Sequence, residues 1–157
     1  YGASLFRRLD YNRIDWVKNS ISEAWSAQNM PRSETDGLEC WVYCNNLKLS
    51  YSFLDSCYNS DFLHSKYSAN YLRHSLSCIK SFEFSLFNLI LNLSYKHRSE
   101  GDEIINLDLE FSRGMKFKSH TANIYLKFFN LTNAKQYDVE GVALPGRWIT
   151  SGLSLEF

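Results

Sequence analysis

The sequence predicts an all-β protein built from antiparallel strands, and three observations lead to this fold class. Apolar and polar residues alternate with period two in several segments, aromatic residues make up 16% of the chain, and the mean hydropathy is slightly negative at −0.33. Strands with one apolar and one polar face produce this combination. No stretch approaches the roughly 18 consecutive apolar residues that a membrane-spanning helix needs, which argues against a helical membrane protein.

The alternation is clearest in four segments. Within 47–53 the odd positions are apolar and the even positions are polar, and the same pattern recurs in 87–96, 105–112 and 149–157. Weaker alternation runs through 72–78 and 122–128. Eight strands are therefore predicted, at 1–18 with a candidate bulge near Asp10, and at 36–44, 46–57, 69–79, 84–98, 103–112, 120–130 and 147–157.

The predicted connections differ in length. Segments 19–35, 58–68 and 131–146 are long, 99–102 and 113–119 are of medium length, and 45 and 80–83 are short. Long loops at one end of a sheet and short turns at the other are typical of outer-membrane barrels, whose strand ends carry an aromatic girdle. The residues expected in such a girdle are Trp16, Trp41, Tyr43, Tyr51, Tyr95 and Trp148. A soluble sandwich or lipocalin-like barrel shows the same alternation with its apolar face inward, so periodicity leaves both folds open.

Charge and reactive residues favour no enzyme. The 17 basic and 17 acidic side chains cancel, so no net charge recommends nucleic acid as a partner. Cys40, Cys44, Cys57 and Cys78 match no zinc framework, and the histidines have no ligand spacing, so we expect no metal and no cofactor. Free, buried thiols are the simplest expectation for the cysteines, since any disulfide would have to join different strands. The Ser-x-x-Lys spacing from Ser77 has no companion motif.

The end of the chain resembles the closing segment of TonB-dependent receptors. The resemblance rests on an Asn-Leu-x-Asn turn with a following Tyr, then Pro-Gly-Arg, then a final strand ending in Phe; these are Asn130, Asn133, Tyr137, Pro145, Gly146, Arg147 and Phe157. The last strand also resembles the signal that outer-membrane barrels present to their assembly machinery, here Thr150, Gly152, Leu155 and Phe157. An edge strand with free hydrogen-bonding groups can pair with another sheet, which gives that signal a physical basis.

The resemblance covers 1–157 as one barrel portion, and it implies the C-terminal part of an antiparallel transmembrane barrel of about 22 strands. The chain begins at Tyr1 without a Met or a leader, so we expect a plug, earlier strands and the TonB-contacting part to precede it. The implied function is active uptake of a scarce nutrient across the bacterial outer membrane with TonB-derived energy. The implied partners are the remaining barrel and plug, outer-membrane lipid, the assembly machinery, TonB and the nutrient.

Ligand contacts are expected in the long loops. The candidates are Trp25, Asn29, Arg32 and Glu34 in the first loop, and Tyr58, Asp61 and His64 in the next. The run Ile14–Val17 with the following Trp resembles cobalamin-type receptors of Bacteroidota; siderophore-iron, haem and a glycan stay open as ligands. Two other interpretations also stay open: a complete eight-stranded outer-membrane barrel with a structural or adhesive role, and a soluble ligand-binding barrel.

Overall fold

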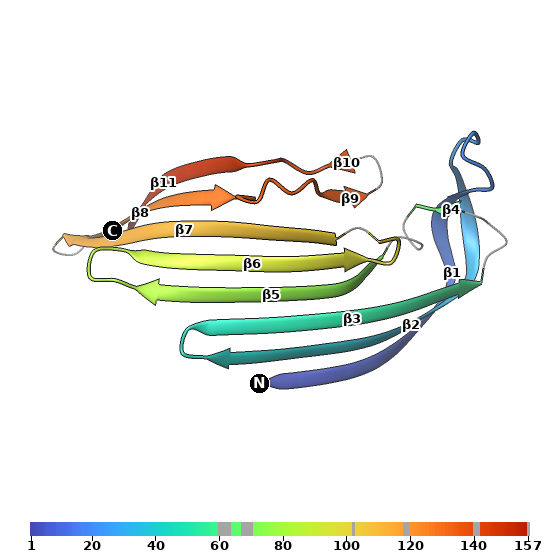
Figure 1. The fold of residues 1–157 in the computed structure, drawn as a ribbon, viewed down its shortest axis with the longest axis horizontal. Helices are drawn as coiled ribbons and strands as arrows, with labels where there is room; N and C mark the ends of the chain where they lie inside the picture. The colour runs from blue at the N-terminus through green and yellow to red at the C-terminus, as the bar shows by residue number, and fades with distance from the viewer. Residues whose placement is uncertain (60–63, 67–70, 102, 118–119, 140–141, 157) are drawn as a thin grey trace.

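The computed structural model describes residues 1–59, 64–66, 71–101, 103–117, 120–139 and 142–156, and these residues form strands and connections without a helix. Eight long strands make up most of the fold (Figure 1). They are β1 (Gly2–Lys18), β2 (Ser26–Cys44), β3 (Leu47–Asn59), β5 (Leu72–Glu83), β6 (Asn88–Arg98), β7 (Glu103–Phe117), β8 (His120–Phe129) and β11 (Trp148–Glu156). Three short strands accompany them: β4 (His64–Ser65), β9 (Tyr137–Val139) and β10 (Val142–Ala143).

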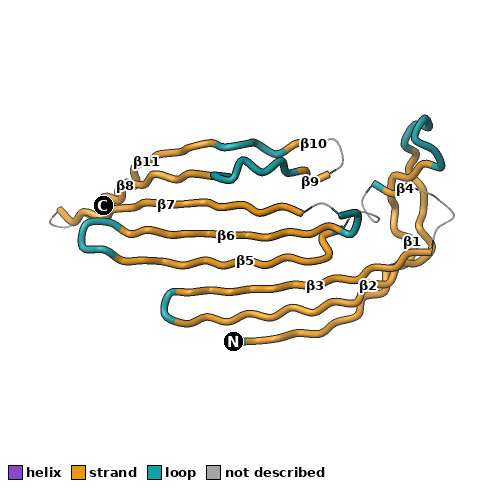
Figure 2. The backbone as a smooth tube through the Cα atoms, in the orientation of Figure 1, coloured by secondary structure: helices purple, strands orange, loops and turns teal. Residues whose placement is uncertain are grey.

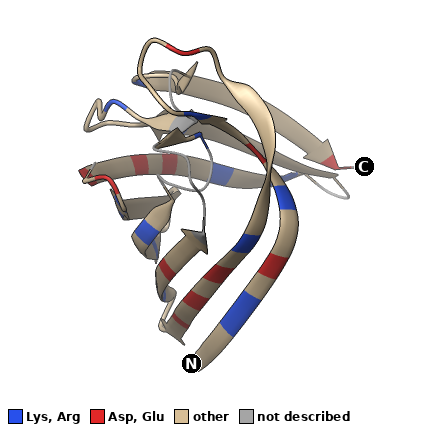
Figure 3. Cartoon of the chain, turned by 90° about the vertical axis from the view of Figure 1, so that its right-hand side faces the viewer, with Lys and Arg blue, Asp and Glu red and all other residues tan. Residues whose placement is uncertain are grey.

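The long strands form one antiparallel sheet in the order β11-β8-β7-β6-β5-β3-β2-β1, with β4 beside β1, and β9 and β10 form a separate hairpin. Short turns join the strands at one end of the sheet, which we call the turn end. The long connections β1–β2, β3–β5 and β8–β11 lie at the other end with the short connection β6–β7, and we call this the loop end (Figure 2). The sheet is strongly curved (Figure 3). Among the described residues β11 and β1 are not paired with each other, so both edges of the curved sheet are open.

The eight predicted strands are confirmed, but five of the predicted connections contain strand residues. The predicted connection 58–68 includes the last two residues of β3 and the short strand β4. Strand β2 begins at Ser26 rather than 36, so ten residues of the predicted first loop are strand. The predicted turn at 80–83 belongs to β5, and the chain turns at 84–87 instead. Strand β7 continues to Phe117 through the predicted connection 113–119, and the predicted loop 131–146 contains the β9–β10 hairpin.

Cross-strand register sorts the side chains of the sheet onto two faces. The register is unbroken in every pair of long strands except β5–β6, where it shifts between Leu72 and His74. Residues opposite one another share a face, so one face collects apolar side chains from all eight long strands. Examples from this apolar face are Leu5, Leu38, Leu49, Leu76, Leu93, Leu107, Phe128 and Leu153. The polar face carries Ser50, Ser77, Ser94, Asn106, Lys127 and Thr150.

The apolar face is uncovered in the part of the chain that the structure describes. Every pair of strands in contact is a pair of sheet neighbours, so no second layer packs on either face. Leu5 is 80% exposed and Leu153 is 60% exposed, whereas the only buried apolar residues among those described are Val17, Met30, Ile104 and Ala122. A soluble monomer rarely leaves so large an apolar surface in water. This face therefore needs a partner outside the described residues.

The aromatic residues expected in a girdle divide between the two faces. Tyr51 and Tyr95 lie on the apolar face, opposite Leu76 in neighbouring strands. Trp41 and Trp148 lie on the polar face, where Trp41 is opposite Gly2 and Trp148 is opposite Phe129. The prediction of a single girdle is therefore wrong, because strand-end position alone does not specify the face.

Three glycines on the polar face each lie under an aromatic ring of the neighbouring strand. Gly2 lies under Trp41, Gly37 under Phe6, and Gly152 under Tyr125, and in each case the two residues are register partners. A Cβ atom at any of these glycines would overlap the ring. Such pairs shield a glycine backbone in a curved sheet and help to define the register.

Two backbone features at asparagines shape the first hairpins. Asn45 and Asn46 have φ of 47° and 60°, so the two-residue turn between β2 and β3 has both central residues in the left-handed region that a type I′ hairpin requires. Asn12 has φ of 55° within β1, and the register on both sides of it is the same, so the bulge predicted near Asp10 is absent. Strands β1 and β2 bend together toward the loop end (Figure 1).

Substitution at Gly37 tests the glycine–aromatic pairs. We expect Gly37→Ala to lower the free energy of unfolding by about 1–3 kcal/mol, because the added methyl group forces the Phe6 ring out of its position. Gly114→Ala is the matched control, since Gly114 also lies on the polar face and its Cβ would meet no atom within 4 Å. Urea unfolding in detergent measures both variants, and equal stabilities would contradict the proposed role of the pair.

Candidate functional site at the loop end

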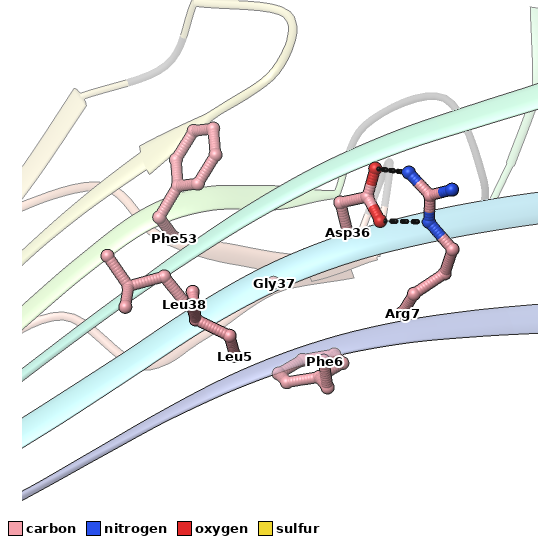
Figure 4. A pocket seen from close by; sticks show the side chains of 7 residues that line it. All are labelled: Leu5, Phe6, Arg7, Asp36, Gly37, Leu38 and Phe53. Atoms are coloured by element: carbon pink, nitrogen blue, oxygen red, sulfur yellow. Dashed lines mark hydrogen bonds and ion pairs between the residues drawn. The ribbon is translucent and has the colours of Figure 1, made fainter.

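The apolar residues of the apolar face form a band that crosses the strands, which we call the apolar band. Toward the loop end, charged residues begin on this face where the band ends. On β2 the band runs from Cys44 to Leu38, and the next residue toward the loop end on this face is Asp36. Arg7 donates two hydrogen bonds to Asp36, from Nε to Oδ1 at 2.7 Å and from Nη2 to Oδ2 at 2.8 Å (Figure 4). The hydrogen bonds from the guanidinium hold the pKa of Asp36 below its usual value. In Figure 4 Leu5, Leu38 and Phe53 lie beside this ion pair, at the edge of the band.

Two predicted ligand residues belong to this network of ion pairs. Arg32 and Glu34 lie in β2 rather than in a loop, so their placement in the first long connection is wrong. Glu34 accepts from Arg7 at 3.2 Å and from Arg32 at 3.2 Å. Nearby, Arg73 pairs with Asp55 at 3.3 Å. Side-by-side basic and acidic segments along these first strands are visible in Figure 3. Each guanidinium in the network thus has a carboxylate neighbour inside the protein.

Beyond the bend, β1 carries a small buried core. Asp15, Val17 and Met30 are fully buried, and Asp15 accepts hydrogen bonds from the Ser65 hydroxyl at 2.7 Å and from the Trp16 amide at 2.7 Å. The amide of Lys66 donates to the Trp16 carbonyl at 2.9 Å. Strand β4, which follows β3 in the chain, is therefore held against β1 by backbone pairing and by a buried carboxylate.

Tyr58 lies close enough to this core to interact with the Asp15 carboxylate. It belongs to β3, where its register partner is Ser33, so its predicted place in a loop is wrong. Burial, followed by the nearby carboxylates of Glu100 and Asp15, raises the pKa of Tyr58. The phenol therefore remains neutral at physiological pH and can act as a hydrogen-bond donor.

The outward side of the β1–β4 pair carries a set of basic and aromatic residues, which we call the loop-end basic patch: Trp16, Lys18, Trp25, His64 and Lys66. Lys18 is opposite His64 in the register, and Ser65 and Val17 face the buried core between these positions. The Nζ of Lys18 lies 4.4 Å from the centroid of the Trp25 ring, and the Nζ of Lys66 lies 6.0 Å from the same centroid. Two ammonium groups therefore converge on one indole.

The predicted loop residues are thus only partly brought together. Trp25, in the connection between β1 and β2, and His64, in β4, join the loop-end basic patch. Asn29 lies in β2 opposite Ile14, not in a loop, and Asp61 lies outside the described residues. Lys18 and Lys66 were not predicted. The sequence signal for this site is the placement of Trp25 and His64 in predicted long connections, and nothing in the sequence pattern marks Lys18 or Lys66.

The residues of the C-terminal motif meet around Asn130. This residue is 4% exposed, and its side chain donates to the carbonyls of Ala134 and Pro145 at 2.9 and 3.4 Å. Its Oδ1 accepts from the Ala134 amide at 2.9 Å and from the Thr132 hydroxyl at 3.3 Å. Its own amide donates to Asp108 at 2.8 Å. One buried asparagine therefore ties the segment after β8 to β7 and to the segment before β11.

The other motif residues lie around this point or along β11. Asn130 and Asn133 have φ of 51° and 54°, a conformation that asparagine tolerates better than most residues. A Cβ at Gly146 would lie 3.2 Å from Oδ1 of Asn133, and the Tyr137 carbonyl accepts from Arg98 at 3.0 Å. Arg147 is exposed. In β11, Thr150 and Gly152 lie on the polar face and Leu155 on the apolar face, while Phe157 lies outside the described residues.

Substitution at Asn130 tests this arrangement. Asn130→Asp keeps the size and the tolerance of positive φ, but it removes both side-chain donors and places a second carboxylate beside Asp108. We expect the free energy of unfolding to fall by about 2–4 kcal/mol. The control is Asn123→Asp on the exposed part of β8, which should change stability by less than about 0.5 kcal/mol. Denaturant unfolding in detergent gives both values, and a loss no larger than in the control would rule out the structural role of Asn130.

Comparisons with models of known protein families, with curated proteins and with solved structures found no match to this chain. All four cysteines are free thiols, but the expectation that they are buried is wrong: Cys44 and Cys57 are exposed, and Cys40 and Cys78 are half-buried. Within the described ranges there is no group of three or more His, Cys, Asp or Glu residues that could hold a metal ion. In the same part of the chain, no helix is long and apolar enough to cross a membrane.

Proposed function

We propose that this chain forms part of the wall of an outer-membrane β-barrel. The observation that carries the proposal is the uncovered apolar face, which extends over all eight long strands and has no covering layer among the described residues. Lipid is the partner that suits such a face, because lipid chains can cover a curved apolar sheet when no second layer of protein packs against it. In hydrocarbon a sheet must pair all its backbone groups, which a closed barrel does.

The continuity of the apolar band supports the proposal. The band spans six residue steps on β3, from Leu47 to Phe53, and again on β6 and β7, from Leu89 to Tyr95 and from Ile105 to Phe111. At about 3.3 Å per residue this is roughly 20 Å along each strand. The Arg7–Asp36 pair lies beyond the band, at the level of the lipid headgroups in this proposal.

The open edges of the sheet favour a large barrel over a small one. A self-contained eight-stranded barrel, the alternative function with a structural or adhesive role, requires β11 to pair with β1, and these strands are unpaired in the described part of the chain. A soluble sandwich requires a second layer on the apolar face, and none of the described strands supplies it. Additional strands at both edges would satisfy the unpaired backbone groups.

The particular barrel we propose is that of a TonB-dependent receptor. The proposal rests on the C-terminal resemblance, and it is supported by the convergence of Asn130 with Pro145 and of Asn133 with Gly146. The chain would then contribute wall and loops to active uptake of a scarce nutrient into a bacterial cell, with energy from TonB. The sequence favours cobalamin as the nutrient, with siderophore-iron or haem as alternatives. The last strand, including Thr150, Gly152 and Leu155, would meet the assembly machinery during insertion.

Spin-label accessibility distinguishes a lipid-facing band from a protein core. A nitroxide would be attached to single cysteines at Leu93 or Leu107 on the apolar face, in a background where the four native cysteines are replaced by alanine. In lipid vesicles we expect these labels to collide readily with oxygen, which concentrates in hydrocarbon, and poorly with a water-soluble nickel complex. The matched controls are labels at the adjacent Ser94 and Asn106 on the polar face, which should show the reverse preference.

The experiment also has a clear negative outcome. If the chain purifies without detergent as a stable monomer, and the labels at Leu93 and Leu107 are shielded from both reagents, the apolar face is a protein core. That result would reject the membrane wall and leave a soluble β-protein.

A further inference from the structure

We propose that the loop-end basic patch binds the carboxylate or phosphate oxygens of a small anionic ligand, with Lys18 and Lys66 as the anion contacts and Trp16 and Trp25 as ring surfaces. This inference rests on the proposed function, because it assigns the substrate class of the same loop end. The observation behind it is the convergence of two ammonium groups on one indole ring.

The two lysines have no acidic partner in the described part of the chain. Three arginines further along these strands have carboxylate partners: Arg7 pairs with Asp36, Arg32 with Glu34, and Arg73 with Asp55. No carboxylate lies within 4.0 Å of Lys18 or Lys66 among the described residues. Glu23, in the same connection as Trp25, accepts instead from the Asn19 amide at 2.8 Å. Among the described residues, the two ammonium groups are therefore free of direct ion pairs at the surface of the patch, with the Asp15 carboxylate buried beneath them.

The separation of the two ammonium groups suits a small polyanion. Their distances to the shared Trp25 centroid, 4.4 and 6.0 Å, limit the distance between the two nitrogens to about 10 Å. Charge-assisted hydrogen bonds from both would require oxygens about 2.7–2.9 Å from each nitrogen. A molecule with two or more carboxylates, or a diphosphate, can contact both nitrogens at once, whereas a monovalent anion such as chloride offers one contact.

The patch is organised before any ligand arrives. Two hydrogen bonds hold strand β4 on β1: the Lys66 amide donates to the Trp16 carbonyl, and the Ser65 hydroxyl donates to the buried Asp15 carboxylate. Lys18 and Lys66 are each half-buried, so their stems are partly immobilised against Trp25. A ligand would lose less free energy to ordering these side chains than it would on freely moving lysines.

The charge of the patch distinguishes among the nutrients considered above. Haem carries propionate groups on a flat apolar ring, and many ferric chelates carry carboxylate or other anionic oxygens. Both combine oxyanions with a surface that Trp16 or Trp25 can contact. Cobalamin presents mostly neutral amides with a single phosphodiester. The structure therefore favours an anionic nutrient over the cobalamin that the sequence resemblance suggests.

Isothermal titration of the full chain in non-ionic detergent tests the proposal with citrate as the tricarboxylate probe and pyrophosphate as the phosphate probe. We expect at least one of them to bind, with affinity that falls as salt rises. In the variant Lys18→Gln/Lys66→Gln the dissociation constant should rise at least about tenfold. The variant Lys18→Arg/Lys66→Arg should keep most of the affinity, since it keeps both positive charges. Comparing the two probes separates a carboxylate site from a phosphate site.

The control is Lys48→Gln, which removes a lysine from the polar face near the turn end, far from the patch. Its dissociation constants should equal those of the wild-type chain, and circular dichroism should show the same β-content for all variants. The inference is overturned if neither probe binds, or if both bind equally well to the Lys18→Gln/Lys66→Gln variant. It is also overturned if binding occurs only to vesicles of anionic lipid, since the patch would then be a lipid contact.

These outcomes are independent of the membrane proposal. Lipid-facing labels at Leu93 and Leu107 without binding of either probe would leave the barrel wall standing and reject the anionic substrate class. Binding of a probe by a water-soluble monomer would keep the site and reject the outer-membrane location.

Discussion

Cross-strand register is the constraint on which the rest of this structure depends. Because side chains alternate between faces, a slip of one residue between any two neighbouring strands would turn every later apolar residue onto the polar face. The register of the long strands is unbroken apart from one shift between Leu72 and His74. The Asn45-Asn46 turn sets it between β2 and β3, and the glycine–aromatic pairs hold it between β1 and β2 and between β8 and β11.

The two ends of the sheet have different physical roles. At the turn end the strands are joined by the shortest connections, and the apolar band lies between them and the charged residues of the loop end. At the loop end β1 and β2 bend beyond the band, and the chain buries a carboxylate, Asp15, to hold β4 in place. Burying a charge is costly without hydrogen-bond partners, and Asp15 has such partners in the Ser65 hydroxyl and the Trp16 amide. The resulting pairing of β4 with β1 brings Lys18 and Lys66 to the same indole ring. The proposed membrane wall, with the proposed anionic ligand site beyond it, accounts for both ends.

Local pattern predicted the strands well where each strand has one apolar and one polar face, as in 47–53 and 105–112. The local pattern failed to predict a strand or a turn where pairing with a distant segment determines the conformation. Residues 26–35 are mostly polar, include Pro31 and have no period of two, yet they are strand because they pair with β1. The turn at 84–87 was missed because its ends are Phe84 and Phe87, and a bond from the Phe84 amide to the Phe87 carbonyl at 2.9 Å closes it without Gly, Pro or Asn.

The sequence by itself determined the fold class, the eight strands and the asymmetry of their connections, because these follow from periodicity and turn residues that act over a few neighbours. It also pointed to Trp25 and His64, and to the asparagines of the C-terminal motif. Only the tertiary structure decided that Lys18 and Lys66 share one indole and that Asn130 reaches Pro145. These contacts join segments far apart in the chain, and their geometry depends on the return of β4 to β1 and on the bonds around Asn130, which no local pattern encodes.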